Sequence, residues 1–219
     1  MGWIQIGLYV VLLVLLAQPL GEHMARVYAG ERTFLTPALG RLERGLLRFI
    51  GVRPDAESGW GVYGLGVLSF NALGFLAVYA LQRAQHLLPL NPAGLGQVTP
   101  DSSFNTAVSF ATNTDWQGYA GETTLSHLTQ MLGLTVQNFV SAATGMAVLV
   151  ALIRGFARRT SATVGNFWVD LVRSTVHVLL PLSVVLALAL ASRGVVQTTA
   201  GAASVQLLDP VVVAADGST

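Results

Sequence analysis

NTAVSFATNTDWQGYAGETTLSHLTQMLGLTVQ, residues 105–137, is a polar stretch that lies between two apolar runs long enough to cross a membrane. Backbone amide and carbonyl groups without partners cost several kcal/mol in hydrocarbon, so irregular backbone at membrane depth is tolerated only inside protein or beside water. The stretch is therefore predicted to re-enter the membrane between the two runs and to line a pathway for a solute.

Composition places the whole chain in the class of membrane proteins. Of its 219 residues, 53% are hydrophobic and only 11% are charged, which is too little charge for a soluble domain of this length. The basic residues are all Arg, and cysteine is absent, which excludes disulfides and thiolate metal sites. We therefore predict an all-α polytopic membrane protein in a lipid bilayer. The formal net charge of +1 gives no reason to expect a nucleic-acid partner.

Residues 1–21 form the first apolar run and are predicted to be a transmembrane helix. The alternative is a cleaved signal peptide, which begins with basic residues and ends in a small-x-small cleavage site. Met1 to Gln5 contain no Arg, however, and the run ends in AQPLGE. Pro19 and Gly21 are expected to end the helix.

Residues 22–58 are predicted to form a cytoplasmic, Arg-rich loop, because six Arg and five acidic residues are concentrated there. Five apolar residues recur within it at helical spacing: Leu39, Leu42, Leu46, Leu47 and Ile50. One interpretation is an amphipathic helix that lies along the membrane surface. The other is a solvated linker with one apolar stripe.

Residues 59–159 are predicted to form one pore unit, made of a span, a re-entrant segment and a second span. The first span covers Trp60 to Leu81, where several glycines allow a neighbouring backbone to come close. Asn71 within it is expected to bond across a helix interface or to face the pore. The re-entrant segment carries a pore helix and a filter at residues 101–118, and the second span covers residues 128–156.

Residues 160–219 are predicted to begin a second pore unit, with a span from Phe167 to Ala191 and an outer loop. Pro181 is tolerated inside that span if a neighbour satisfies the carbonyl that it leaves free. His177 and Ser183 are expected to form hydrogen bonds between helices. The predicted fold is therefore four spans and one pore helix, arranged as helix–pore loop–helix.

The distribution of Arg predicts the orientation. Ten of the twelve Arg lie in the first loop or in the segment from Arg154 to Arg173, and only Arg83 and Arg193 lie on the other side. Cytoplasmic loops are enriched in Arg, so both termini are predicted to be extracytoplasmic. The re-entrant loop would then enter the membrane from the outer face.

The predicted pore helix covers residues 103–111. Asp101 or Ser102 would cap its N-terminus, and Phe104, Val108 and Ala111 would share one face. The C-terminal end of such a helix carries a partial negative charge. This end would stabilise a dehydrated cation at membrane depth and repel an anion.

A polar run follows the predicted pore helix. Backbone carbonyls of such a run can replace the hydration shell of a monovalent cation, as in potassium filters. A plain surface loop can have the same composition, but it would not need spans so close on both sides. The candidate cation-binding residues are Thr112, Asn113, Thr114, Asp115 and Gln117.

Other polar residues near the membrane each have two interpretations. Glu122 would either attract ions or stabilise the first turn of the third span. His127 has no second ligand at metal-binding spacing and is expected to pack or to face the mouth of the pathway. Gln137 and Asn138 are adjacent amides in a spanning helix, so at least one is expected to face the pore or another subunit. Glu122, Gln137 and Asn138 are therefore candidates for the ion pathway.

Three stretches carry a resemblance to a known family: NTAVSFATNTDWQ (105–117), GETTLS (121–126) and GLTVQNFVSAATG (133–145). They resemble the first pore region of the potassium-binding subunit of Kdp-type P-type ATPases. The Arg-rich segment and GNFWVDLVR (165–173) extend the resemblance over essentially the whole chain. It implies the fold of the potassium-transporter superfamily, in which four pore loops form one filter.

The resemblance also implies roles for individual residues. K⁺ would be the transported ion, without a covalently bound cofactor, and Asn113, Thr114 and Asp115 would form the filter strand. Gln117 would shape the outer site. Asp115 departs from the neutral residue expected in a filter, and its side chain is predicted to point away from the ion.

A partner is implied because the sequence contains neither a nucleotide-binding P-loop nor a DKTG phosphorylation motif. The chain is therefore predicted not to hydrolyse ATP itself. The resemblance implies a P-type ATPase catalytic subunit and small accessory membrane subunits in the bacterial plasma membrane. This chain would bind extracytoplasmic K⁺ with high affinity and pass it to the pump subunit for ATP-driven import.

One pore loop cannot surround an axis, so the chain is expected to be the N-terminal portion of the family subunit. Four copies around an axis are the alternative. Two other functions also stay open. A stand-alone potassium channel or secondary transporter of the same superfamily would share the filter, and a membrane scaffold would share only the helices.

Overall fold

The computed structural model describes residues 2–158 and 161–201, so Arg159 and most of the predicted outer loop lie outside the described residues. Four helical segments are long and apolar enough to cross a membrane: Gly2–Ala29, Trp60–Leu87, Thr129–Ala157 and Phe167–Ser192. In this part of the chain the only extended pairing is one bridge between Ser58 and Gly165. The all-α prediction is therefore confirmed, and each predicted span corresponds to one of the four segments.

Helix α1 (Gly2–Ala29) is longer than predicted, because it continues through Pro19 and Gly21 instead of ending there. Proline removes one backbone N–H, and membrane helices tolerate this loss when neighbouring groups adjust. Contacts with the fourth span hold the additional turns. The Tyr28 hydroxyl lies 2.7 Å from the Ser174 hydroxyl, and His23 donates to the carbonyl oxygen of His177 at 2.9 Å. Residues 22–29 thus belong to the helix and not to the loop.

Helix α2 (Thr36–Ile50) corresponds to the predicted amphipathic helix, and its place along the membrane surface stays a prediction. Pro37 lies in its first turn, and Gly51 ends it with a φ of 78°, a left-handed conformation that suits glycine. Leu47 is 2% exposed and packs in a cluster with three valines of the fourth span: Val169, Val172 and Val176. One face of α2 therefore contacts protein.

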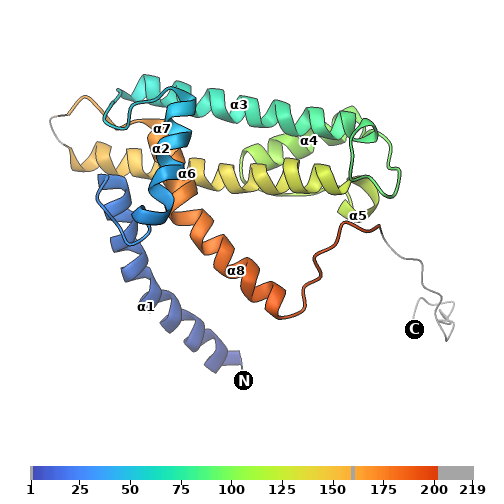
Figure 1. Ribbon diagram of the computed structural model, residues 1–219, viewed down its shortest axis with the longest axis horizontal. Coiled ribbons are helices and arrows are strands. Elements are labelled where there is room, and N and C mark those ends of the chain that lie inside the picture. Colours follow the sequence, from blue (N-terminus) through green and yellow to red (C-terminus); the bar gives the residue numbers. More distant parts are fainter. Residues whose placement is uncertain (1, 159–160, 202–219) are drawn as a thin grey trace.

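The pore unit comprises six helical elements: α3 (Trp60–Ala84), the 3₁₀ turn η1 (Gln85–Leu87), α4 (Pro100–Ala111), α5 (Gly121–Thr124), the π-helical turn η2 (Thr129–Thr135) and α6 (Val136–Ala157). Helices α3 and α6 lie side by side with opposite chain directions, and α4 lies with them at one end (Figure 1). A hydrophobic cluster that includes Val78 of α3, Phe110 of α4 and Leu134 of η2 joins the elements there. The predicted re-entrant helix is thus packed between the two spans.

The fourth span is built from α7 (Phe167–Arg173), the π-helical turn η3 (Ser174–Leu179) and α8 (Leu180–Ser192). Pro181 lies in the first turn of α8 and has no N–H for the carbonyl of His177, four residues earlier. His23 of α1 donates to that same carbonyl oxygen. A neighbouring helix therefore satisfies the group that the proline leaves free, as predicted.

Polar side chains within the spans differ in their partners. His177 Nε2 lies 3.0 Å from Glu43 Oε2 of α2, which confirms the predicted bond between helices. The Ser183 hydroxyl instead donates to the Leu180 carbonyl of its own helix, and the Asn71 amide donates to the Val67 carbonyl four residues earlier. The predicted interhelical bond is wrong for Ser183, because a short polar side chain in a helix can reach the carbonyls of its preceding turn.

A buried ion pair joins the third and fourth spans. Arg154 of α6 makes two contacts with Asp170 of α7, from Nη1 to Oδ2 at 2.5 Å and from Nη2 to Oδ1 at 2.9 Å. The Asp170 side chain is 1% exposed, and the Tyr63 hydroxyl lies 3.1 Å from its Oδ2. In the sequence Arg154 contributes only to the predicted orientation, whereas in the structure its side chain joins two spans.

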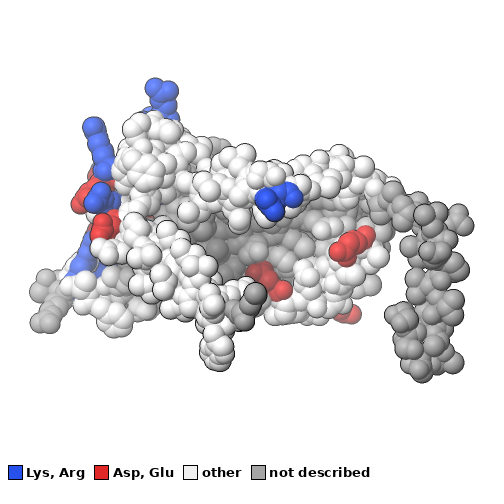
Figure 2. All heavy atoms as spheres, turned by 90° about the horizontal axis from the view of Figure 1, so that it is seen from below, with Lys and Arg blue, Asp and Glu red and all other residues white. Residues whose placement is uncertain are grey.

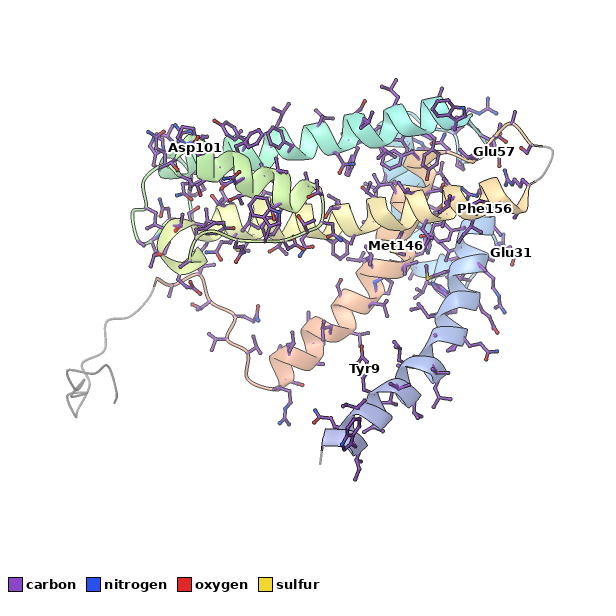
Figure 3. The ribbon with its side chains drawn as sticks, turned by 180° about the vertical axis from the view of Figure 1, so that it is seen from behind. Tyr9, Glu31, Glu57, Asp101, Met146 and Phe156 are labelled. Atoms are coloured by element: carbon purple, nitrogen blue, oxygen red, sulfur yellow. The ribbon has the colours of Figure 1, made fainter. Side chains whose placement is uncertain are left out.

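Most basic side chains in view gather at one end of the molecule (Figure 2). Glu31 and Glu57 also lie at this end, while Asp101 lies at the opposite end of the pair formed by α3 and α6 (Figure 3). Hydrogen bonds from Thr163 and Arg158 hold the pKa of Glu57 below its usual value. The apolar spans therefore end, on the side where α2 lies, at a region of charged side chains.

Candidate functional site

The pore helix α4 begins one turn before the predicted residue 103. Its N-cap is Thr99 and Pro100 occupies the first turn, where a missing N–H costs nothing, so neither Asp101 nor Ser102 caps it through a side chain. Phe104, Val108 and Ala111 share one side of α4, as predicted, but this side is not the buried one, since Phe104 is 53% exposed. The buried residues of α4 are Ser103, Thr106, Ala107, Ser109 and Phe110. Packing against α3 thus selects a face of small and hydroxyl side chains, which a hydrophobicity pattern does not reveal.

The run after α4 folds back on the end of that helix. The backbone N–H groups of Thr112, Asn113, Thr114 and Asp115 all donate to carbonyl oxygens of residues 108–110, at 3.0–3.4 Å. In a trans peptide the carbonyl of one residue points opposite to the N–H of the next. The carbonyls of residues 111–114 therefore point away from α4, and no group in the described part of the chain donates to them.

Two residues of this run have left-handed backbones. Asn113 and Asp115 each have a φ of 56°, while Thr114 between them does not have a positive φ. Asparagine and aspartate tolerate this conformation better than other side-chain-bearing residues. Asn113 and Asp115 thus allow left-handed backbone to alternate with ordinary backbone along the run. With this alternation, successive N–H groups all point toward α4.

Three side-chain hydrogen bonds hold the run against α4 and α6. The Ser109 hydroxyl of α4 donates to the Trp116 carbonyl at 2.9 Å, and the Thr114 hydroxyl donates to the Ser109 carbonyl at 3.1 Å. From α6, the Ser141 hydroxyl donates to Asn113 Oδ1 at 3.1 Å. Ser109 and Ser141 were missed by sequence reasoning, because an isolated serine in an apolar run carries no recognisable signal.

Gln117 and Asp115 lie on the open side of the loop. Both residues are exposed, and Gln117 Nε2 lies 3.5 Å from the Tyr119 hydroxyl. The Asp115 side chain makes no ion pair within the described residues.

The predicted pathway residues differ in their surroundings. Glu122 is exposed on α5, a separate single turn rather than the first turn of the third span. Gln137 is buried, and its amide lies so close to Gly74 of α3 that a Cβ at that glycine would overlap it. Asn138 is exposed, as is expected of a residue that faces a pathway or another chain. The two adjacent amides thus point in different directions, as predicted.

Two buried glutamines, Gln82 of α3 and Gln85 of η1, support the re-entrant segment, and both were missed from sequence. Gln85 donates to the carbonyls of Gly96 and Thr124 at 2.6 and 2.9 Å, and its Oε1 accepts from the backbone N–H of Ser126 at 3.0 Å. Gln82 donates to the Ser103 carbonyl at 3.2 Å. These side chains connect the end of α3 to α4 itself and to the loop segments before and after it.

The arrangement suits a cation that has lost its water. The free carbonyl oxygens of residues 111–114 present partial negative charge, and the C-terminal end of α4 adds to it. The carboxylate of exposed Asp115 can raise the local concentration of cations without being part of the carbonyl array.

Comparison with known proteins also finds relatives that are named for binding a cation. Residues 7–217 match the family model described as the potassium-transporting ATPase A subunit. The chain belongs to this family. A relative from Sorangium cellulosum is 60% identical over 210 residues and one from Methylococcus capsulatus is 64% identical over 197 residues, which are 96% and 90% of this chain. Both relatives are named potassium-transporting ATPase potassium-binding subunit.

The chain spans about a third of the length of these curated relatives, since the matches cover 36% and 33% of them. A relative from Herpetosiphon aurantiacus is 57% identical over 99% of this chain and 37% of its own length. Family membership and the four apolar helices together make this member of the potassium-transporting ATPase A subunit family a multi-pass membrane protein.

Proposed function

We propose that this chain supplies the first of the loops that form a potassium filter in a longer potassium-binding subunit. The observation that carries the proposal is the array of carbonyls at residues 111–114, which point away from α4 and accept no hydrogen bond from the described residues. Neutral carbonyl oxygens are the ligands that replace the hydration shell of K⁺. Thr112, Asn113 and Thr114 contribute three of these carbonyls. Together with Asp115 they form the proposed filter strand, and Gln117 borders the outer site.

The longer polypeptide of the relatives accounts for what one loop lacks. A single loop cannot surround an ion, whereas two thirds of each relative's length lies beyond the part that matches this chain. We infer that further loops of the same kind complete the filter around one axis. Exposure of the loop on its open side supports this, because those faces would be covered by the other loops.

ATP hydrolysis is assigned to a separate P-type ATPase subunit, with small accessory membrane subunits beside it. The relatives' name identifies a potassium-binding subunit of an ATPase, which supports a division of labour between binding and hydrolysis. K⁺ would pass from the filter to that pump subunit for high-affinity import. Exposed Asn138 and Glu122 are the pathway candidates, while buried Gln137 spaces α3 from α6.

The proposed membrane is the bacterial plasma membrane, with both termini of this portion outside the cytoplasm. Because the chain contains no cysteine, single introduced cysteines can report the side. Gln97→Cys, near the start of α4, is expected to react with a membrane-impermeant maleimide in intact cells. Arg53→Cys, beyond α2, is expected to react only after the membrane is permeabilised. The opposite pattern would reverse the orientation.

Gln117→Arg tests the filter. In the assembled complex this change is expected to raise the K⁺ concentration for half-maximal ATP hydrolysis by about tenfold or more, because a fixed cation within a few ångströms of the site repels K⁺ by more than about 1 kcal/mol. The matched control is Gln97→Arg, which adds the same charge at the same end of the molecule, away from the loop.

Two outcomes would count against the proposal. Equal shifts in both variants would mean that general surface charge, and not a position beside the filter, causes the effect. An unchanged K⁺ requirement in Gln117→Arg would separate the loop from potassium binding altogether. Potassium flux that needs neither ATP nor the pump subunit would support the stand-alone channel or secondary transporter instead.

A further inference from the structure

Helix α2 has three faces that differ in chemistry. At 3.6 residues per turn, the positions of Leu47, of Arg41, Arg44 and Arg48, and of Leu42 and Phe49 lie about 120° apart around the helix axis. The first face packs against the fourth span, as described above. The other two faces are exposed and have no contact that explains their composition.

The second face consists of three Arg that are spaced to share one side of the helix. Arg41, Arg44 and Arg48 are all exposed, and within the described residues none of them is part of an ion pair. The one acidic residue of α2, Glu43, lies on the buried side and is already engaged by Arg173 and His177, at 3.1 and 3.0 Å. The positive charge of this face is therefore not neutralised by an ion pair among residues 2–158 and 161–201.

The third face is apolar and open. Leu42 is 44% exposed and Phe49 is 90% exposed. A large aromatic side chain this exposed is unfavourable in water, but it is common where a helix lies at the level of the lipid headgroups. Apolar and Arg-bearing faces side by side are typical of a helix that rests in that region.

The placement of α2 agrees with such a position. It packs against the first turns of the fourth span, at the end of the molecule where charged side chains gather (Figure 2). Its axis runs across the direction of α3 and α6 (Figure 1). Because α3 and α6 cross the membrane, an axis across them lies along the membrane plane.

We propose that Arg41, Arg44 and Arg48 bind the phosphate groups of anionic phospholipids, while Leu42 and Phe49 rest among the acyl chains. Arg donates forked N–H pairs that match phosphate oxygens, so it suits this contact better than a point charge does. The site takes a lipid and not a free phosphate ion, because the apolar face supplies half of the contact.

Lipid titration of the detergent-solubilised chain tests the site. Native mass spectrometry gives the dissociation constant of the first bound phosphatidylglycerol and, in parallel, of phosphatidylcholine. Phosphatidylglycerol is expected to bind more tightly. The triple variant Arg41→Gln, Arg44→Gln, Arg48→Gln should weaken its binding by about fivefold or more, since one Arg near a headgroup is worth about fivefold. Phosphatidylcholine binding should change little.

A matched triple variant isolates the position of the charges. Arg26→Gln, Arg32→Gln, Arg53→Gln removes the same charge from exposed residues at the same end, outside α2, and is expected to keep phosphatidylglycerol binding. Replacing the three α2 Arg with Lys should retain most of it. Equal losses in both Gln triples would overturn the site, as would no loss in the α2 triple or displacement of the lipid by inorganic phosphate alone.

Discussion

Arg154→Ala is expected to lower the free energy of unfolding by about 3–5 kcal/mol, because it leaves a buried carboxylate without its partner. Asp170 is 1% exposed, so water cannot replace the two guanidinium contacts at 2.5 and 2.9 Å. The change also removes the donor that lies 3.4 Å from the Tyr28 carbonyl at the end of α1. Unfolding of the purified protein in detergent, followed by tryptophan fluorescence, measures the effect, since Trp168 lies two residues from Asp170.

The control for this prediction is a second Arg–Asp pair in the same chain. Arg53 and Asp55 lie 2.9 Å apart, but their side chains are 80% and 70% exposed. Arg53→Ala is therefore expected to cost less than about 1 kcal/mol, as is usual for ion pairs in water. If Arg154→Ala lowered the free energy of unfolding no more than Arg53→Ala does, the ion pair between α6 and α7 would not hold the two spans together as its geometry indicates.

Gly165→Ala is expected to be the second severe change. Gly165 has a φ of 107°, a conformation that residues with a Cβ adopt only under strain of about 1–3 kcal/mol. An added Cβ would also overlap the guanidinium of Arg154 and push it away from Asp170. The free energy of unfolding should thus fall by about 3 kcal/mol or more, most of it through the ion pair.

Gly51→Ala separates the two causes of that loss. Gly51 has a φ of 78° but has open space where a Cβ would lie, so alanine there meets only the backbone cost of about 1–2 kcal/mol. In the double variant Arg154→Ala, Gly165→Ala, the loss of unfolding free energy should be much smaller than the sum of the losses in the two single variants. Both single changes remove the same contact between Arg154 and Asp170. Full additivity would show that Gly165 acts independently of Arg154.

The spans could be predicted from sequence because hydrophobic length alone decides them. The pore helix was also predicted, since a polar stretch between two spans has few structural alternatives in a membrane. The end of α1 was not, because Pro19 and Gly21 are stop signals whose effect depends on neighbours. The contacts of Tyr28 and His23 with the fourth span, more than 140 residues away, override them.

In the candidate site, too, the sequence predicts the segment but not the long-range contacts that position its atoms. A polar run of Thr, Asn and Asp could be recognised as a filter candidate from its setting, and the structure keeps that run together. The direction of its carbonyls depends on the φ of Asn113 and Asp115, and its position depends on Ser109, Ser141 and Gln85. These supporting residues are ordinary polar side chains whose roles arise only from long-range packing.

The carbonyl of His177, which Pro181 leaves free, has a consequence for how the chain is assembled during synthesis. The donor that this carbonyl needs belongs to His23, which leaves the ribosome more than 150 residues earlier. The contacts of α1 with the fourth span can therefore form only after the last described helix has been made. Contacts between the first and the fourth of the four apolar segments thus form late relative to the synthesis of the segments between them.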